Sequence, residues 1–307
     1  MKNIKKVRVI GLTAITLLVC QLALVSYLKS NEVPKEKTKA KASSQDIVNS
    51  NKNNNSISED DSVKISDTSA KSIDISKISI SDYEDKLIKK ADAKNYKRNI
   101  ENYKKVLVQF SVDEGYRDEI DKLIAEGNNM TDIFTAYDFL NDNYGMLKDL
   151  EMLLQEKRKG ANWTNIFSKY KAESRNFKPS DFSAEYLNKL LGEYKLTAED
   201  IMLADRVSQL SGKKFEDIIE NKRKGKTWSE IKKEIGIINL QADMERVSIA
   251  SNDVKKYVGE NFSQQQAMDA LVMAKKLNKE ANVVVNEIKA GKTQEDIYAE
   301  YYAEKYN

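Results

Sequence analysis

Carboxylates are the residues in this sequence with the clearest capacity for acid–base chemistry. Two of them suffice to cleave a glycosidic bond, one as the acid and one as the base or nucleophile. A dense group lies before the first repeat described below: Asp113, Glu114, Asp118, Glu119 and Asp121. A solvated helix face has the same composition, and nothing singles out a pair. The sequence therefore leaves a carboxylate-based cell-wall glycoside hydrolase open and predicts no particular catalytic residue.

Histidine is absent, and the single cysteine, Cys20, lies in an apolar N-terminal run. These counts exclude Ser-His-Asp and Cys-His catalysis, histidine-ligated zinc sites, zinc sites built from several cysteines, and a disulfide within the chain. No Walker A, dinucleotide, EF-hand or G-x-S-x-G motif occurs. We therefore expect a protein that is not an enzyme and has no cofactor or metal.

Two basic clusters each precede a glycine. They are Lys157, Arg158 and Lys159 before Gly160, and Lys222, Arg223 and Lys224 before Gly225. Such cations could bind an anionic wall polymer or lipid headgroups. Basic residues in the last turn of a helix also complement its dipole just before a glycine cap. We prefer this second interpretation, because it explains both type and position, and keep the six cations as candidate partner-binding residues.

Aromatic residues form a second set of candidates. Trp163 and Trp228 are each followed by Ile at i+3, which predicts core residues rather than sugar-stacking platforms. Tyr298, Tyr301 and Tyr302 lie at helical spacing near the C-terminus. They predict either a helix that caps the last repeat or an edge that docks a partner, since aromatic residues are enriched at interfaces.

An internal repeat must position these residues. Segments near 130–167, 196–235 and 262–298 align almost without gaps. Equivalent positions of the three copies hold Gly145, Gly212 and Asn278, and then Gly160, Gly225 and Gly291. The regular recurrence predicts similar supersecondary units.

One copy shows how such a unit is built. Gly225 suits a left-handed helix cap, and Thr227 with Glu230 matches a capping box that starts the next helix. Each unit is predicted to contain three helices, and a linking helix is expected near 245–259. The fold class is all-α, with an extended stack or curved bundle of units over residues 82–307.

The repeat resembles helix-turn-helix-like repeats with a G-K-x-W-x-E-I signature in uncharacterised bacterial surface proteins. The signature is complete at 225–231. The copy at 160–166 has Ala161 and Asn165 at two of its positions, and the copy at 291–297 lacks the Trp. The resemblance covers roughly residues 130–307 and implies a repeat architecture without any particular activity.

The N-terminus carries a membrane-targeting pattern. Four basic residues between Lys2 and Arg8 precede an uncharged run from Val9 to Leu28. About 20 residues cover the roughly 30 Å hydrocarbon core as a helix, and the leading cations favour a cytoplasmic N-terminus. Residues 1–28 are thus predicted to form a cytoplasmic tip and a transmembrane helix. A cleaved signal peptide or a lipid-modified Cys20 are alternatives, and all three place the rest of the chain outside the cytoplasm.

Residues 29–81 are rich in Ser, Asn, Lys and Asp and are predicted to be a disordered linker. Residues 1–81 hold 13 basic and 8 acidic residues, which leaves 38 basic and 40 acidic residues in 82–307. A duplex-binding domain usually has a strong basic surface, so we expect no nucleic-acid partner.

Together these patterns predict a single-pass protein of the cell membrane with its C-terminal domain outside the cytoplasm. We expect its helical repeats to bind a protein or another envelope component without catalysis. The alternatives are the hydrolase named above and a membrane-tethered regulator that binds nucleic acid.

Overall fold

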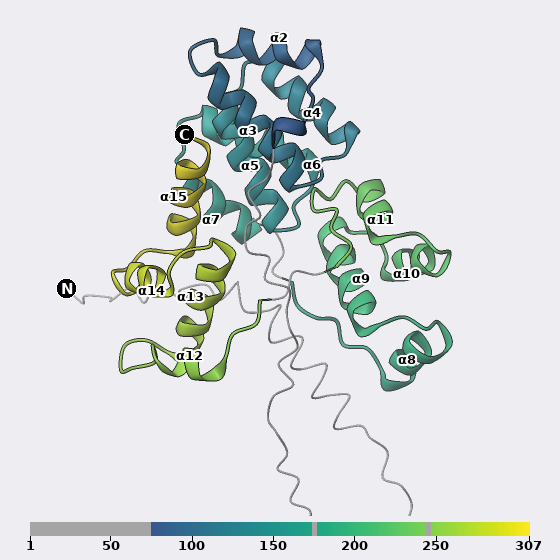
Figure 1. Ribbon diagram of the computed structural model, residues 1–307. Coiled ribbons are helices and arrows are strands. Elements are labelled where there is room, and N and C mark those ends of the chain that lie inside the picture. The colour runs from purple at the N-terminus through teal and green to yellow at the C-terminus, as the bar shows by residue number, and fades with distance from the viewer. Residues whose placement is uncertain (1–74, 174–176, 244–246) are drawn as a thin grey trace, which may run out of the picture.

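The computed structural model describes residues 75–173, 177–243 and 247–307, and this part of the chain is helical without strands (Figure 1). For these residues the all-α prediction is confirmed. The predicted transmembrane segment and residues 29–74 of the predicted linker lie outside the described residues. Within the described residues, no helix combines the length and apolar character that crossing a membrane requires. The end of the predicted linker is structured, because Ile75–Lys77 form the 3-10 turn η1.

Three helices precede the first repeat and form the top of the molecule in Figure 1. They are α2 (Asp82–Ala91), α3 (Tyr96–Gln109) and α4 (Glu114–Ala125). A capping box starts α2: the Ser81 amide donates to Glu84 Oε2 at 2.6 Å, and the Glu84 amide donates to Ser81 Oγ at 3.2 Å. The three helices share a core with the first repeat, around Tyr103 and Ile120.

Each aligned repeat contains three consecutive helices. Unit 1 consists of α5 (Met130–Asp142), α6 (Leu147–Arg158) and α7 (Trp163–Glu173). Unit 2 consists of α9 (Ala198–Ser211), α10 (Phe215–Arg223) and α11 (Trp228–Ile235). Unit 3 consists of α13 (Gln264–Lys276), α14 (Ala281–Lys289) and α15 (Gln294–Tyr306).

The loops between these helices follow the local chemistry of the sequence. Thr227 and Glu230 form a reciprocal capping box at the start of α11. Gly225 just before it has φ 91°, and Gly160 and Gly291 have φ 92° and 95°. All three values lie in the left-handed region, which glycine adopts without a steric penalty. The second and third helices of each unit are therefore joined by similar turns.

The first loop of unit 1 differs from the sequence alignment. The left-handed residue there is Tyr144, with φ 58°, whereas units 2 and 3 use Gly212 and Asn278, with φ 71° and 49°. Gly145, which the alignment pairs with Gly212, is instead required for close packing. A Cβ atom at this position would lie 2.4 Å from Leu140 Cδ2.

The segments between the units are less helical than expected. In place of a linking helix at 245–259, the described residues hold the short helix α12 (Ser251–Lys255). Helical hydrogen bonding stops after α12, and Gly259 then pairs with Phe262 in an isolated bridge before unit 3. The short helix α8 (Ala184–Asn188) and the π-helical turn η2 (Lys189–Glu193) precede unit 2.

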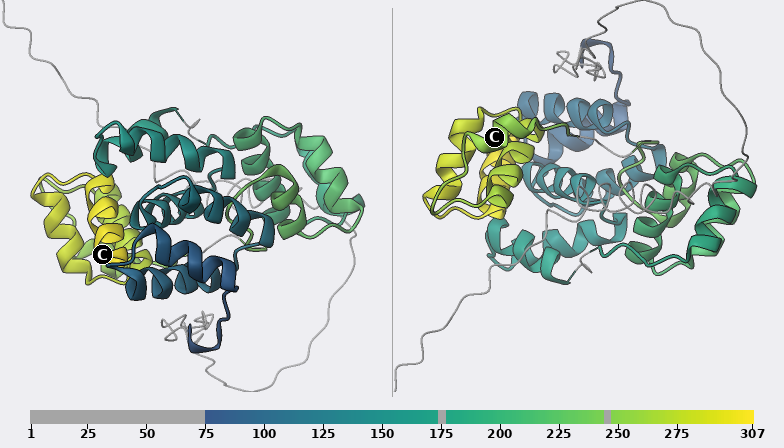
Figure 2. Two further views of the ribbon diagram at one scale, coloured as in Figure 1. Left: turned by 90° about the horizontal axis from the view of Figure 1, so that it is seen from above. Right: turned by 90° about the horizontal axis from the view of Figure 1, so that it is seen from below.

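Units 2 and 3 lie on opposite sides of unit 1 (Figures 1 and 2). Helix α15 runs beside α7 and α5, so the C-terminal helix belongs to two cores. Ile297 packs in the core of unit 3, whereas Tyr302 and Tyr306 pack in the core of unit 1. The chain therefore folds back onto its first repeat and does not continue as a linear stack.

Unit 2 joins unit 1 through backbone hydrogen bonds. The Leu147 amide donates to the Gly236 carbonyl at 2.8 Å, and the Ile238 amide donates to the Gly145 carbonyl at 2.9 Å. Tyr116 Oη donates to the Ile237 carbonyl at 3.1 Å. Gly145 thus lies at the centre of this junction.

We expect Gly145→Ala to lower the free energy of unfolding by about 1–3 kcal/mol, as overpacking usually does. The new methyl group would collide with Leu140 and would lie 2.9 Å from Tyr170 Oη. Thermal unfolding of the full chain, followed by circular dichroism, measures the change. Gly192→Ala is the matched control, because no atom lies within 4 Å of a Cβ placed there. An equal loss in both variants would contradict the packing role of Gly145.

Candidate functional site

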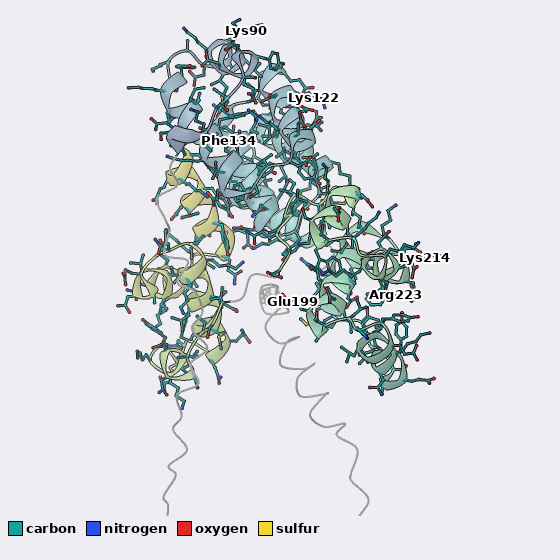
Figure 3. The ribbon with its side chains drawn as sticks, turned by 45° about the vertical axis from the view of Figure 1, so that its right-hand side comes forward. Lys90, Lys122, Phe134, Glu199, Lys214 and Arg223 are labelled. Carbon is teal, nitrogen blue, oxygen red and sulfur yellow. The ribbon has the colours of Figure 1, made fainter. Side chains whose placement is uncertain are left out.

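A cavity of about 680 Å³ lies between the start of α2 and helix α4, and we call it the α2–α4 cavity. Its α2 side is lined by Ser79, Ile80, Ser81, Tyr83 and Glu84. Its α4 side is lined by Glu114, Arg117, Asp118, Asp121 and Lys122, the last of which is labelled in Figure 3. The cavity therefore combines one aromatic side chain with several charged ones.

The inner wall of the cavity contains a buried hydrogen-bond network of four residues. Tyr103 Oη, on α3, lies 2.8 Å from Glu84 Oε1 and 2.6 Å from Asp121 Oδ1. The Arg117 guanidinium holds both oxygens of Glu84, with Nη2 at 2.6 Å from Oε2 and Nε on Oε1. Glu84, Tyr103 and Asp121 are all buried. We call these four residues the tyrosine–carboxylate network, and it ties α2, α3 and α4 together.

The hydroxyl of Tyr103 lies between the two carboxyl groups of this network. A tyrosine hydroxyl has one proton, so it can donate to one of its two carboxyl neighbours. Burial opposes ionisation of Glu84, but hydrogen bonds from Arg117 and Ser81 outweigh it and lower the pKa of Glu84. Burial raises the pKa of Asp121, despite the hydrogen bond from Tyr103. The Tyr103 hydroxyl lies within donating distance of both carboxyl groups but can donate to only one at a time, and burial favours the protonated form of Asp121 more than that of Glu84.

We expect Asp121→Asn to stabilise the protein above neutral pH by about 0.5–1.5 kcal/mol, the size of one hydrogen bond. The folded pKa of Asp121 is raised, so its stabilising contribution is complete at low pH and declines as pH rises through that pKa. An asparagine keeps a donor toward Tyr103 and does not titrate. Thermal unfolding midpoints measured between pH 4 and pH 8 test this, with the exposed neighbour Asp118→Asn as control. A benefit that is equal at all pH values would show that ionisation of Asp121 does not limit the stability of the protein.

The rim of the cavity is open to solvent. Tyr83 is 62% exposed, the largest exposure among the big hydrophobic residues of the described chain. Glu114 and Asp118 lie one helical turn apart on α4, and both are exposed. The interior polar groups are thus fixed by one another, while the rim groups remain accessible.

A second cavity, of about 380 Å³, lies between unit 1 and the end of α9. Tyr170 Oη donates to Asp149 Oδ2 at 2.7 Å there, and Met152 is 40% exposed at its edge. It lies at the junction of two units, and its charged lining residues are Lys148, Asp149 and Glu173.

The basic clusters lie in the last turns of α6 and α10, in different units, where their charge complements the helix dipoles. Five of these six cations have acidic partners: Lys159 pairs with Glu156 at 2.9 Å and Arg223, labelled in Figure 3, pairs with Glu220 at 2.7 Å. Three further pairs are longer: Arg158 lies 3.8 Å from Glu151, Lys222 lies 3.7 Å from Asp200, and Lys224 lies 3.7 Å from Glu220. The two clusters therefore belong to different helices, and neighbouring carboxylates and helix ends offset most of their charge.

The two tryptophans are buried, which confirms that they are core residues. The Trp163 indole N–H donates to Asp132 at 3.2 Å, and the Trp228 indole N–H donates to Asp200 at 2.7 Å. The ammonium groups of Lys157 and Lys222 lie 5.5 and 5.4 Å from the centres of these rings. The Asp–Trp–Lys arrangement recurs in units 1 and 2 and fixes the third helix of each unit against its first.

The C-terminal tyrosines pack inside the molecule to different degrees. Tyr302 is fully buried, and its hydroxyl donates to Asp142 Oδ2 at 2.8 Å. Tyr298 and Tyr301 are half-buried and contact the Tyr302 ring. These residues bind α15 to unit 1, so Tyr302 has no surface to offer a partner.

Sequence reasoning missed three of the four residues of the tyrosine–carboxylate network. Asp121 was among the grouped carboxylates, but Glu84, Tyr103 and Arg117 were not singled out. The S-x-x-E spacing of Ser81 and Glu84 is a recognisable capping signal, yet it does not reveal that Glu84 also faces Arg117. In the described residues, no group of His, Cys, Asp and Glu could hold a metal ion.

No protein-family model, curated protein or solved structure matches this chain. The fold and the site define a helical protein with a preformed polar cavity near the start of its described residues.

Proposed function

We propose that this protein is a non-catalytic binding protein that contacts a protein or another envelope component through the α2–α4 cavity. The observation that carries the proposal is the contrast between the interior of this cavity and its rim. Its buried polar groups are held by mutual hydrogen bonds, and the Tyr83 and Asp118 side chains at its rim are exposed. A fixed interior with accessible polar and aromatic rim groups is what a preorganised binding site requires.

The proposal includes a membrane anchor. Residues 9–28 would cross the membrane once, residues 29–74 would tether the helical units, and the units would lie outside the cytoplasm. The support is the uncharged run and the basic residues that precede it. Protease added to intact cells should then digest the helical units. Protection of the units until the membrane is permeabilised would contradict this topology.

A photo-crosslinking residue at position 83 tests the binding site in the full chain. We expect it to capture a defined partner in native membranes, because the Tyr83 side chain projects from the rim. Position 283 provides the matched control, because Val283 is also an exposed apolar residue, at 47%, but lies on α14 of unit 3. Identical products at both positions, or none at position 83, would contradict the proposal.

A glycoside hydrolase is the second candidate function, favoured by one observation. Two nearly buried carboxyl groups, Glu84 and Asp121, converge on the same tyrosine hydroxyl in a cavity wall. Glu84 is neutralised by Arg117, however, and this pairing suits a structural role better than a nucleophile. A zymogram on cell-wall material discriminates: a clearing band that Asp121→Asn abolishes would favour the hydrolase.

A further inference from the structure

We propose that the α2–α4 cavity binds an alkylammonium group through Tyr83, Glu114, Asp118 and Asp121. The group could belong to a small diamine or to a lysine side chain, which present the same chemistry. This inference rests on the proposed binding function and names the ligand chemistry of that same site.

The rim carries negative charge that the described chain leaves uncompensated. Glu114 and Asp118 have no ion-pair partner among the described residues. The two cations of the cavity are engaged elsewhere, since Arg117 binds Glu84 and Lys122 binds Glu119 at 2.9 Å. The two free carboxylates lie at i and i+4 on one helix face, so both can reach one bound cation.

The wall of the cavity offers a further acceptor. Asp121 is 8% exposed, and its Oδ1 atom is the one that contacts Tyr103. Asp121 lines the cavity, and its Oδ2 atom is not among the buried side-chain atoms that lack a hydrogen-bond partner, so this oxygen is open to the cavity. An ammonium group that enters the cavity can donate to it and offset the charge of the carboxylate.

Tyr83 completes the site on the α2 side. Its ring stands at the cavity rim and is 62% exposed, so it is free to contact a ligand. An aromatic face attracts a cation, and its apolar surface suits the methylene chain that carries an alkylammonium group. The combination selects an organic amine over an inorganic cation, which would gain nothing from the methylene contact.

Binding of a cation should be coupled to the Asp121 proton. The groups that face Asp121 are Glu84 from α2, Tyr103 from α3, and Arg117 and Asp118 from α4. Burial raises the pKa of Asp121, whereas a bound ammonium group favours its ionised form. Amine binding is therefore expected to release a proton and to strengthen as the pH rises through this pKa.

Saturation-transfer NMR on the full chain in nanodiscs of neutral lipid tests the proposal. The probes are 1,5-diaminopentane, a lysine tetrapeptide, and 1,5-pentanediol as the uncharged match. We expect an amine probe to bind and the diol not to bind. Stronger binding of the diamine would identify a small amine as the ligand, and stronger binding of the peptide would identify a lysine-bearing chain.

Two variants with equal charge change separate this site from general electrostatics. Glu114→Gln/Asp118→Asn should weaken amine binding about tenfold, whereas Asp181→Asn/Glu185→Gln, at exposed positions in and before α8, should leave it unchanged. Tyr83→Leu should weaken it about two- to fivefold by removing the aromatic face. Circular dichroism would verify that each variant is folded.

The inference is overturned if the diol binds as well as the diamine, if both double variants weaken binding equally, or if neither amine probe binds. Crosslinking at position 83 remains independent of these results. A specific crosslinked partner without amine binding would reject the ligand class and keep the proposed binding function. Amine binding without a crosslinked partner would keep the ligand class and reject a protein or envelope partner at this cavity.

Discussion

Tyr302→Ala is expected to lower the free energy of unfolding by about 3–5 kcal/mol, the range for truncating a large buried aromatic side chain. Tyr302 is fully buried and lies edge-on to Phe167 of α7, with ring centres 6.0 Å apart. Its hydroxyl donates to Asp142 Oδ2 at 2.8 Å. Removing the ring therefore creates a cavity where α15 packs on unit 1 and also removes a buried hydrogen bond.

The loss should be concentrated at this junction. Hydrogen exchange is expected to accelerate in α15 and in α7, because α15 is the helix that joins unit 3 to unit 1. Tyr302→Phe should lose about 1 kcal/mol, since it keeps the ring and removes the hydroxyl. Glu304→Ala, at an exposed position of the same helix, is the control. A uniform increase in exchange over all three units would show that Tyr302 does not act locally.

The repeat units could be predicted because their helix caps and turns are set by residues that are close together in the sequence. The side chain of Thr227 and the carboxylate of Glu230 meet across three residues of the same chain segment, so the sequence alone places them together. The left-handed turn at Gly225 is set by one residue in the same way. Helix order and the caps therefore followed from spacing.

The arrangement of the units could not be predicted, because helical spacing shows which side chains are buried but not what they pack against. Tyr302 was recognisable as part of an aromatic helix face. Its partner Asp142 lies in the first unit and is not adjacent in any sequence pattern. A helix that belongs to two cores looks in sequence like a helix that caps one.

The candidate site could not be predicted from the sequence for a related reason. Asp121 belongs to a run of carboxylates that resembles a solvated helix face. Packing of α2 against α4 buries it, and that contact brings Glu84 and Arg117 together. Similarly, Gly145 aligns with Gly212, but the close approach of Leu140 that requires it is a tertiary contact.

Lys305→Met is expected to produce the second large effect, a loss of about 3–5 kcal/mol at pH 8, as for other buried ion pairs that lose one partner. Asp138, on α5, is 2% exposed and receives hydrogen bonds from Lys305 Nζ at 2.5 Å and from Tyr306 Oη at 2.8 Å. Without the ammonium group, the buried carboxylate is opposed by desolvation and by the nearby charge of Asp142. Chemical denaturation of the full chain measures the loss.

The pH dependence distinguishes this mechanism from a loss of packing. Burial raises the pKa of Asp138 to about 6, so its contribution to stability is complete below its ordinary value of 3.8 and declines as pH rises toward 6. Lys305 counteracts this rise, and Lys305→Met should extend the decline to higher pH. The difference in unfolding free energy between variant and parent should therefore shrink on acidification to pH 5, where Asp138 takes up a proton.

In the double variant Asp138→Asn/Lys305→Met no carboxylate is left at position 138 to ionise, so much of the stability should return at pH 8. A deficit that is equal at pH 5 and pH 8, or that persists in the double variant, would assign the role of Lys305 to its methylene chain instead of its charge.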